Sequence, residues 1–181
     1  MHRRALFRST SALIGLTVLS GCNLITTTTT NGVTTVTVAV AQIVSYAQAA
    51  INFTQLILGV VGVVVDPTIA SLLRITSTTL AADLQTFVTE NSGKVTLSFD
   101  STSVPSSISS LLTDCQKVLT LAKTALGDTV NAAASEYIQA FSTVVSVFQG
   151  ILGFFSATKA PTATAPQLTE TAALAKLGVV R

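Results

Sequence analysis

The stretch from residue 38 to residue 65, VAVAQIVSYAQAAINFTQLILGVVGVVV, decides the fold that we expect. It contains no charged residue, and its polar and small residues recur every three or four positions. That spacing places them on one narrow stripe of a helix and leaves the rest of the circumference apolar. A helix of this kind is expected at the centre of a bundle, or in contact with lipid or a second copy of the chain. The stripe comprises Gln42, Ser45, Gln48, Asn52, Gln55, Gly59 and Gly62.

A second segment, residues 129–155, repeats this design with Gln139, Ser142, Ser146, Gln149 and Gly153 as its stripe. Two amphipathic segments lie between the two apolar ones. Asp66-Pro67 and Pro105 are typical helix starts, and Gly93 and Gly127 follow helix ends. We therefore predict a mainly α fold, an antiparallel up-down four-helix bundle, over residues 38–156. Its helices are expected at about 38–65, 67–91, 105–126 and 129–155.

The two stripes have three interpretations. They face water, or they pack against each other with glycines allowing close approach and amides bonding across, or the apolar faces beside them contact a partner or lipid. We treat them as a candidate helix-packing or ligand stripe. Its members are Gln48, Asn52, Gln55, Gly59, Gly62, Gln139, Gln149 and Gly153.

Residues 22–37 are rich in threonine and valine, which favour extended chain. Asn31-Gly32 lies between two such runs and is typical of a β-hairpin turn. A Thr-rich tether without fixed structure is the alternative. Residues 94–99 alternate in the manner of a third strand and are expected to pair with residues 33–38.

Residues 157–181 do not continue the apolar helical pattern of the preceding segments. Residues 157–167 combine Pro161 and Pro166 with alternating Ala and Thr, which predicts an extended linker. A short helix is expected at 168–177, with Leu168, Ala172 and Leu177 on a thin apolar face. We expect this tail to be mobile or loosely docked.

The first 21 residues have the features of a secretory signal. His2, Arg3, Arg4 and Arg8 precede an apolar run over residues 12–19. That run is too short to span a bilayer, which takes about 20 residues.

The run ends in Leu19-Ser20-Gly21-Cys22, which resembles the lipobox of bacterial lipoproteins. The resemblance covers residues 1–23 only. It implies that a diacylglycerol is attached to the thiol of Cys22, that the signal is cut between Gly21 and Cys22, and that the new amino group is acylated. It also implies a lipid-anchored protein of the cell envelope, and Asn23 in place of aspartate favours the outer membrane, facing the periplasm or the cell surface. An ordinary cleaved signal with a chance cysteine is the alternative.

The charge balance argues against nucleic acid as a partner. The net charge of +2 belongs to the whole chain of 181 residues. Removal of residues 1–21 takes away Arg3, Arg4 and Arg8, which leaves seven basic against eight acidic residues. No basic patch then remains that could neutralise several phosphates.

The residue types for common catalytic and metal sites are missing. The only histidine, His2, leaves with the signal, so Cys115 has no histidine to activate it. Because Cys115 lies at helical spacing with apolar residues, it is expected to be a buried thiol. No metal-ligand cluster, Gly-x-Ser-x-Gly or phosphate-binding loop occurs. The carboxylates of Asp83, Glu90, Asp114 and Glu136 are interpreted as solvated helix-face charges. We expect no enzyme activity, cofactor or metal.

The sequence thus predicts a non-catalytic, exported lipoprotein that acts as a structural or protein-binding module, with a protein partner or self-association. One alternative is a carrier of a lipid or other apolar ligand between the first and fourth helices. Another is a membrane-active lipoprotein, such as a phage-related exclusion or lysis factor.

Overall fold

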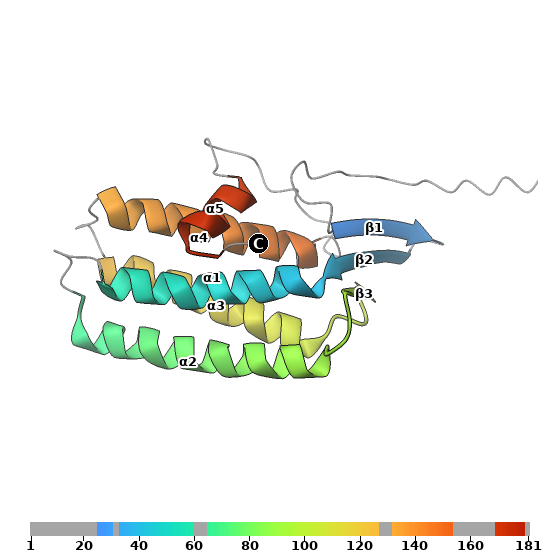
Figure 1. Ribbon diagram of the computed structural model, residues 1–181, viewed down its shortest axis with the longest axis horizontal. Helices are drawn as coiled ribbons and strands as arrows, with labels where there is room; N and C mark the ends of the chain where they lie inside the picture. Colours follow the sequence, from blue (N-terminus) through green and yellow to red (C-terminus); the bar gives the residue numbers. More distant parts are fainter. Residues whose placement is uncertain (1–24, 31–32, 60–64, 127–131, 154–168, 180–181) are drawn as a thin grey trace, which may run out of the picture.

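A computed structural model describes residues 25–30, 33–59, 65–126, 132–153 and 169–179 of the chain. Within these ranges the fold is mainly helical, which confirms the predicted class, and a small sheet lies at one end of the helices (Figure 1). The strands are β1 (Ile25–Thr30), β2 (Val33–Ala39) and β3 (Thr96–Asp100). The helices are α1 (Val40–Gly59), α2 (Pro67–Glu90), α3 (Ser106–Leu126), α4 (Ala132–Gly153) and α5 (Glu170–Lys176).

The boundaries of α2 and α3 agree with the prediction to within one residue, whereas α1 starts later than predicted. Val38 and Ala39 belong to β2 and not to α1, because both pair with β3 through the register Val38↔Leu97 and Ala39↔Thr96. The α2 start follows the predicted signal: Asp66 Oδ1 accepts hydrogen bonds from the backbone N–H of Thr68 at 2.8 Å and of Ile69 at 3.3 Å. Residues 60–64, 129–131 and 154–155 of the predicted helices lie outside the described ranges.

The N-terminal segment forms a sheet and not a tether. β1 pairs antiparallel with β2, β2 pairs antiparallel with β3, and the order is β1-β2-β3. The expected third strand is therefore confirmed, although it covers residues 96–100 instead of 94–99, and the Asn31-Gly32 turn lies outside the described residues. One face buries Val36, Val38, Leu97 and Phe99 against the helices. The other face carries hydroxyls, among them the pair Thr37 Oγ1 and Ser98 Oγ at 2.7 Å.

α1 packs against α2, α3 and α4, and its Tyr46 and Phe53 are among the largest fully buried side chains. Its contact with α4 is aromatic. The ring centroids of Tyr46 and Phe148 are 5.3 Å apart, and those of Phe53 and Phe141 are 4.4 Å apart. Because the partners on α4 occur in the reverse order, the two helices run in opposite directions. None of the helices in the described ranges is long and apolar enough to cross a membrane.

The C-terminal helix is docked, contrary to the expectation of a mobile or loosely held tail. α5 lies across α4 and α1, and Ala173, Leu174 and Leu177 are buried there. The predicted face was partly wrong, since Ala172 is exposed and Leu168 lies outside the described residues. Thr169 fixes the start of the helix, because its hydroxyl caps the first turn by accepting from the Ala172 N–H at 3.3 Å.

Candidate functional site

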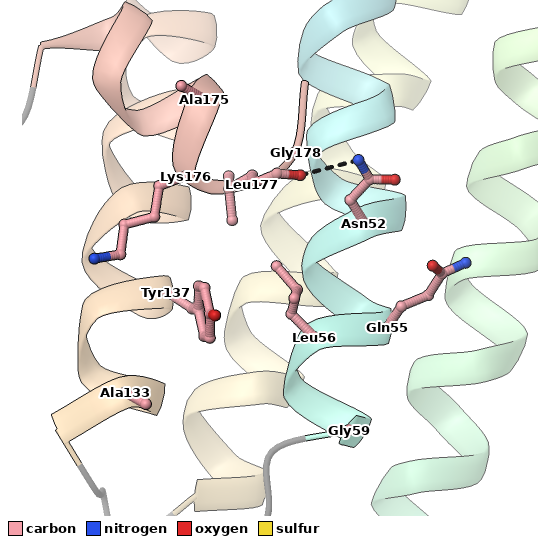
Figure 2. A pocket seen from close by; sticks show the side chains of 10 residues that line it. All are labelled: Asn52, Gln55, Leu56, Gly59, Ala133, Tyr137, Ala175, Lys176, Leu177 and Gly178. Atoms are coloured by element: carbon pink, nitrogen blue, oxygen red, sulfur yellow. Dashed lines mark hydrogen bonds between the residues drawn. The ribbon is translucent and has the colours of Figure 1, made fainter. Parts of the chain in front are cut away.

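A pocket of about 770 Å³ opens between α1, α4 and the C-terminal turn of α5 (Figure 2). Leu56 of α1 and Tyr137 of α4 face each other below this turn. Two amides on α1 and small residues at the helix ends complete the wall. The other lining residues are Asn52, Gln55, Gly59, Ala133, Ala175, Lys176, Leu177 and Gly178.

Asn52 ties α5 to α1 at the rim of this pocket. Its Nδ2 donates to the carbonyl oxygen of Leu177 at 2.9 Å, while its Oδ1 accepts from Gln48 Nε2 at 3.0 Å. The chain turns at Gly178, whose φ of 73° favours glycine. The amides of Gln48 and Asn52 therefore hold the end of α5.

The pocket offers a nearly neutral surface. Lys176 is the only charged residue among those lining it, and its ammonium group forms an ion pair with Glu136 of α4. Both side chains are partly exposed, so the pair orients α5 more than it stabilises the fold.

A polar cluster holds the other end of α5. The Tyr46 hydroxyl donates to Glu170 Oε1 at 3.0 Å, and Gln42 Nε2 lies 3.3 Å from the same oxygen and also bonds to the Tyr46 hydroxyl. Gln42 and Tyr46 are fully buried. The Gln42 Oε1 has no hydrogen-bond partner among the described residues.

This cluster was not predicted from the sequence. Gln42 belonged to the first stripe, but its role depends on Glu170, 128 residues further along the chain. The sequence did contain one hint, because Glu170 and Lys176 are charged residues in a tail with few charges. The side chain of Glu170 bonds to α1, and that of Lys176 pairs with Glu136 of α4.

The stripe residues of α1 and those of α4 lie in different parts of the structure. Gln48 and Asn52 lie beneath α5, and Gln55 and Gly59 line the pocket. On α4, Gln139 and Gly153 are exposed, and Gln149 lies in a separate groove beside Gln116, Thr120 and Lys123 of α3.

Of the three interpretations, the packing of the two stripes against each other does not hold for the described residues. A Cβ placed at Gly59 or Gly153 meets no atom within 4 Å among the described residues, so neither glycine serves a close helix contact. α1 and α4 meet through stacked aromatic rings instead, which bury more apolar area than amides at the same positions. Gly21, Cys22 and Gly62 lie outside the described residues.

No known protein family, curated protein or solved structure matches this chain. The chemistry that the site supports is therefore inferred from its own residues.

Two further titratable features lie away from the pocket. Cys115 is buried with a free thiol, as expected, and burial together with the nearby Asp114 raises its pKa to about 12. Such a thiol stays protonated and is a poor nucleophile. Within the described residues, no group of three or more His, Cys, Asp or Glu is placed to hold a metal ion.

Asp114 is not the fully solvated charge that the sequence suggested. Burial between α2 and α3 raises its pKa above the ordinary 3.8, and the negative charge of Asp83 and a hydrogen bond to that residue raise it further. Lys117 acts in the opposite direction but does not cancel the shift. The two carboxyl groups thus make an unfavourable contact at neutral pH.

We expect Asp114→Asn to stabilise the protein at neutral pH. In the folded chain Asp114 holds its proton to higher pH than in the unfolded chain, so stability falls as the pH rises from 3.8 through the raised pKa. The gain from the substitution should be full above that range and absent below pH 3.8. Urea denaturation at several pH values measures it.

Asp100→Asn is the matched control of opposite sign. Hydrogen bonds from Thr102 and Ser103 lower the pKa of Asp100, so its ionised form favours folding. This variant should lose stability at neutral pH. If Asp114→Asn stabilised the protein by the same amount at every pH, this would contradict the proposed repulsion between Asp114 and Asp83.

Proposed function

We propose that this protein is an exported lipoprotein of the cell envelope, anchored by lipid on Cys22, whose helical domain is a non-catalytic structural or protein-binding module. The lipobox-like Leu19-Ser20-Gly21-Cys22 carries the proposal. The outer membrane, on its periplasmic or outer face, is the proposed location.

The fold suits such an anchor. β1 begins at Ile25, so only Asn23 and Leu24 separate the proposed lipid from the sheet. We take α1 to α4 as an up-down four-helix bundle. The 20 residues of α1 extend about 30 Å from the sheet, and the pocket lies towards the far end of α1. Lipid at Cys22 would therefore leave the pocket free to meet a partner.

Protein binding is favoured over nucleic-acid binding by the charge of the mature chain, which is close to neutral. A surface this poor in charge suits association with another protein. We propose a protein partner or a second copy, with no metal or other cofactor.

A second candidate function is supported by the pocket itself. It lies between α1 and α4, where the sequence suggested a carrier site, and its volume of about 770 Å³ is within the range of small-molecule sites. The ligand would be uncharged and largely apolar, because the only charged lining residue is already paired. Uptake of the neutral dye N-phenyl-1-naphthylamine, lost in Tyr137→Ala, would favour this candidate.

The test of the main proposal is mass spectrometry of the protein extracted from its host membranes in mild detergent. We expect a chain that starts at Cys22 and carries acyl mass. Cys22→Ala should lack that mass and leave the membrane fraction, because each buried methylene adds about 0.8 kcal/mol to anchoring. Cys115→Ala is the matched control and should keep both the mass and the membrane location.

An unmodified chain that is cut elsewhere would remove the lipid anchor from the proposal. Under mild native conditions, the same spectra report whether a stoichiometric protein or a small ligand travels with the chain. A protein partner supports the binding module, and a bound apolar molecule supports the carrier.

A further inference from the structure

The groove between α1 and α4 is longer than the helix that covers it. α5 has seven residues and spans the groove from the level of Gln42 and Tyr46 to that of Asn52. The pocket continues beyond α5 for about two helical turns of α1, from Asn52 to Gly59. In Figure 2 this continuation lies below Leu177, between Leu56 and Tyr137.

α5 shows which residues the covered part of the groove accepts. An acid, Glu170, bonds to the Tyr46 hydroxyl and to Gln42. Leucines at positions 174 and 177 are buried, and a base, Lys176, pairs with Glu136. The groove therefore accepts an acid at one position, leucines four and seven positions later, and a base two positions after the first leucine.

Three features make α5 a replaceable occupant. A seven-residue helix is too short to be stable alone, so it depends on its docking contacts. Beside the contact with Glu170, the Oε1 of Gln42 is buried without a partner among the described residues, which costs free energy in this arrangement. Finally, α1 to α4 all precede α5 in the sequence, so the release of α5 leaves these four helices connected as before.

We infer that the groove between α1 and α4 is a docking site for an amphipathic helix of another protein, and that α5 occupies part of it as an internal competitor. This inference rests on the proposed binding module and names its site. The partner helix carries the residue pattern of α5 and continues about two turns further, with apolar residues that fill the pocket between Leu56 and Tyr137.

The test uses the full-length protein extracted in mild detergent and two fluorescent peptides. The short peptide has the sequence of residues 168–181, and the long one adds two leucine-bearing helical turns directly after Leu177. In the protein, Leu174→Asp places a charge in the buried face of α5 and releases it. Binding is measured by fluorescence anisotropy, folding by circular dichroism and mass by light scattering.

We expect the Leu174→Asp protein to stay folded and to bind the short peptide at least about tenfold more tightly than the unchanged protein, in which the internal helix competes at high effective concentration. The long peptide should bind more tightly again. Ala133→Trp, which fills the pocket, should remove only the gain of the long peptide. Gln149→Trp, in the separate groove with α3, is the control and should leave both affinities unchanged.

A charge exchange checks the orientation of the bound helix. A short peptide with Lys176→Glu should bind up to about fivefold more weakly to the Leu174→Asp protein, and a further Glu136→Lys change in the protein should restore the affinity. A general loss of packing would not be restored in this way.

Four results would overturn the inference. The first two are a Leu174→Asp protein that is folded but binds neither peptide, and a Leu174→Asp protein that is unfolded. The third is a hydrogen-exchange measurement on the unchanged protein in which the amides of α5 exchange only together with those of α1. The fourth is the formation of dimers that swap α5, with no gain in affinity for the long peptide. The last result assigns the groove to a second copy. The state of Cys22 is read from the same sample, so a missing anchor is distinguishable from a missing docking site.

Discussion

Replacing Phe53 by alanine should lower the free energy of unfolding by about 3–5 kcal/mol. The ring of Phe53 is fully buried and stacks on that of Phe141, with centroids 4.4 Å apart and planes inclined by 25°. The substitution removes apolar area from the centre of the molecule and leaves a cavity between α1 and α4. Because domains of this size are stable by about 5–15 kcal/mol, much of the total would be lost. Denaturation in urea measures the change.

A double-mutant cycle with Phe141→Ala isolates the contact itself. The two changes together should cost less than the sum of their separate effects, by about 0.5–1.5 kcal/mol for the stacked pair. Gln139→Ala, at an exposed position on α4, should change the stability by no more than about 0.5 kcal/mol. If Phe53→Ala costs no more than this control, the aromatic contact does not join the two helices.

Val38→Asp should cost several kcal/mol and leave much of the protein unfolded. Val38 is fully buried and pairs with Ile25 on one side and Leu97 on the other. A carboxylate there would lie among the apolar side chains of the core, and α1 starts only two residues later. Thermal unfolding by circular dichroism measures the effect.

The matched control is Thr28→Asp, at an exposed position of β1. It should leave the midpoint of unfolding almost unchanged, because its charge stays in water. Equal stability of the two variants would mean that residues 22–37 act as a tether in solution and that the sheet adds nothing to the core.

The helices were predictable because their signals are local. The spacing of polar residues, the Asp66-Pro67 start and the glycine after α2 each act within a few residues, and the boundaries of α2 and α3 agree with them to within one residue. The third strand was predictable for the same reason, from the alternation at Val95, Leu97 and Phe99. The choice between hairpin and tether was not, since β1 has few apolar side chains and gains its order from pairing with β2.

The candidate site was only partly predictable. Asn52, Gln55 and Gly59 were singled out by their spacing on α1, and they do line the pocket. The stripe on α4 follows the same spacing yet faces water and α3. Periodicity shows that residues share a face of a helix, but the neighbour of that face depends on how the helix is rotated in the fold.

By itself, the sequence determined the mainly α class and the positions of the main helices, since each depends on residues close together in the chain. The lipid anchor is a proposal that rests on residues 19–22 alone. Only the tertiary structure decided that α5 packs against α1 and α4, that Glu170 meets Gln42 and Tyr46, and that a pocket remains beyond Leu177. The physical reason is that these contacts join residues more than 120 positions apart. Their energy depends on shape and burial, which arise when the helices come together.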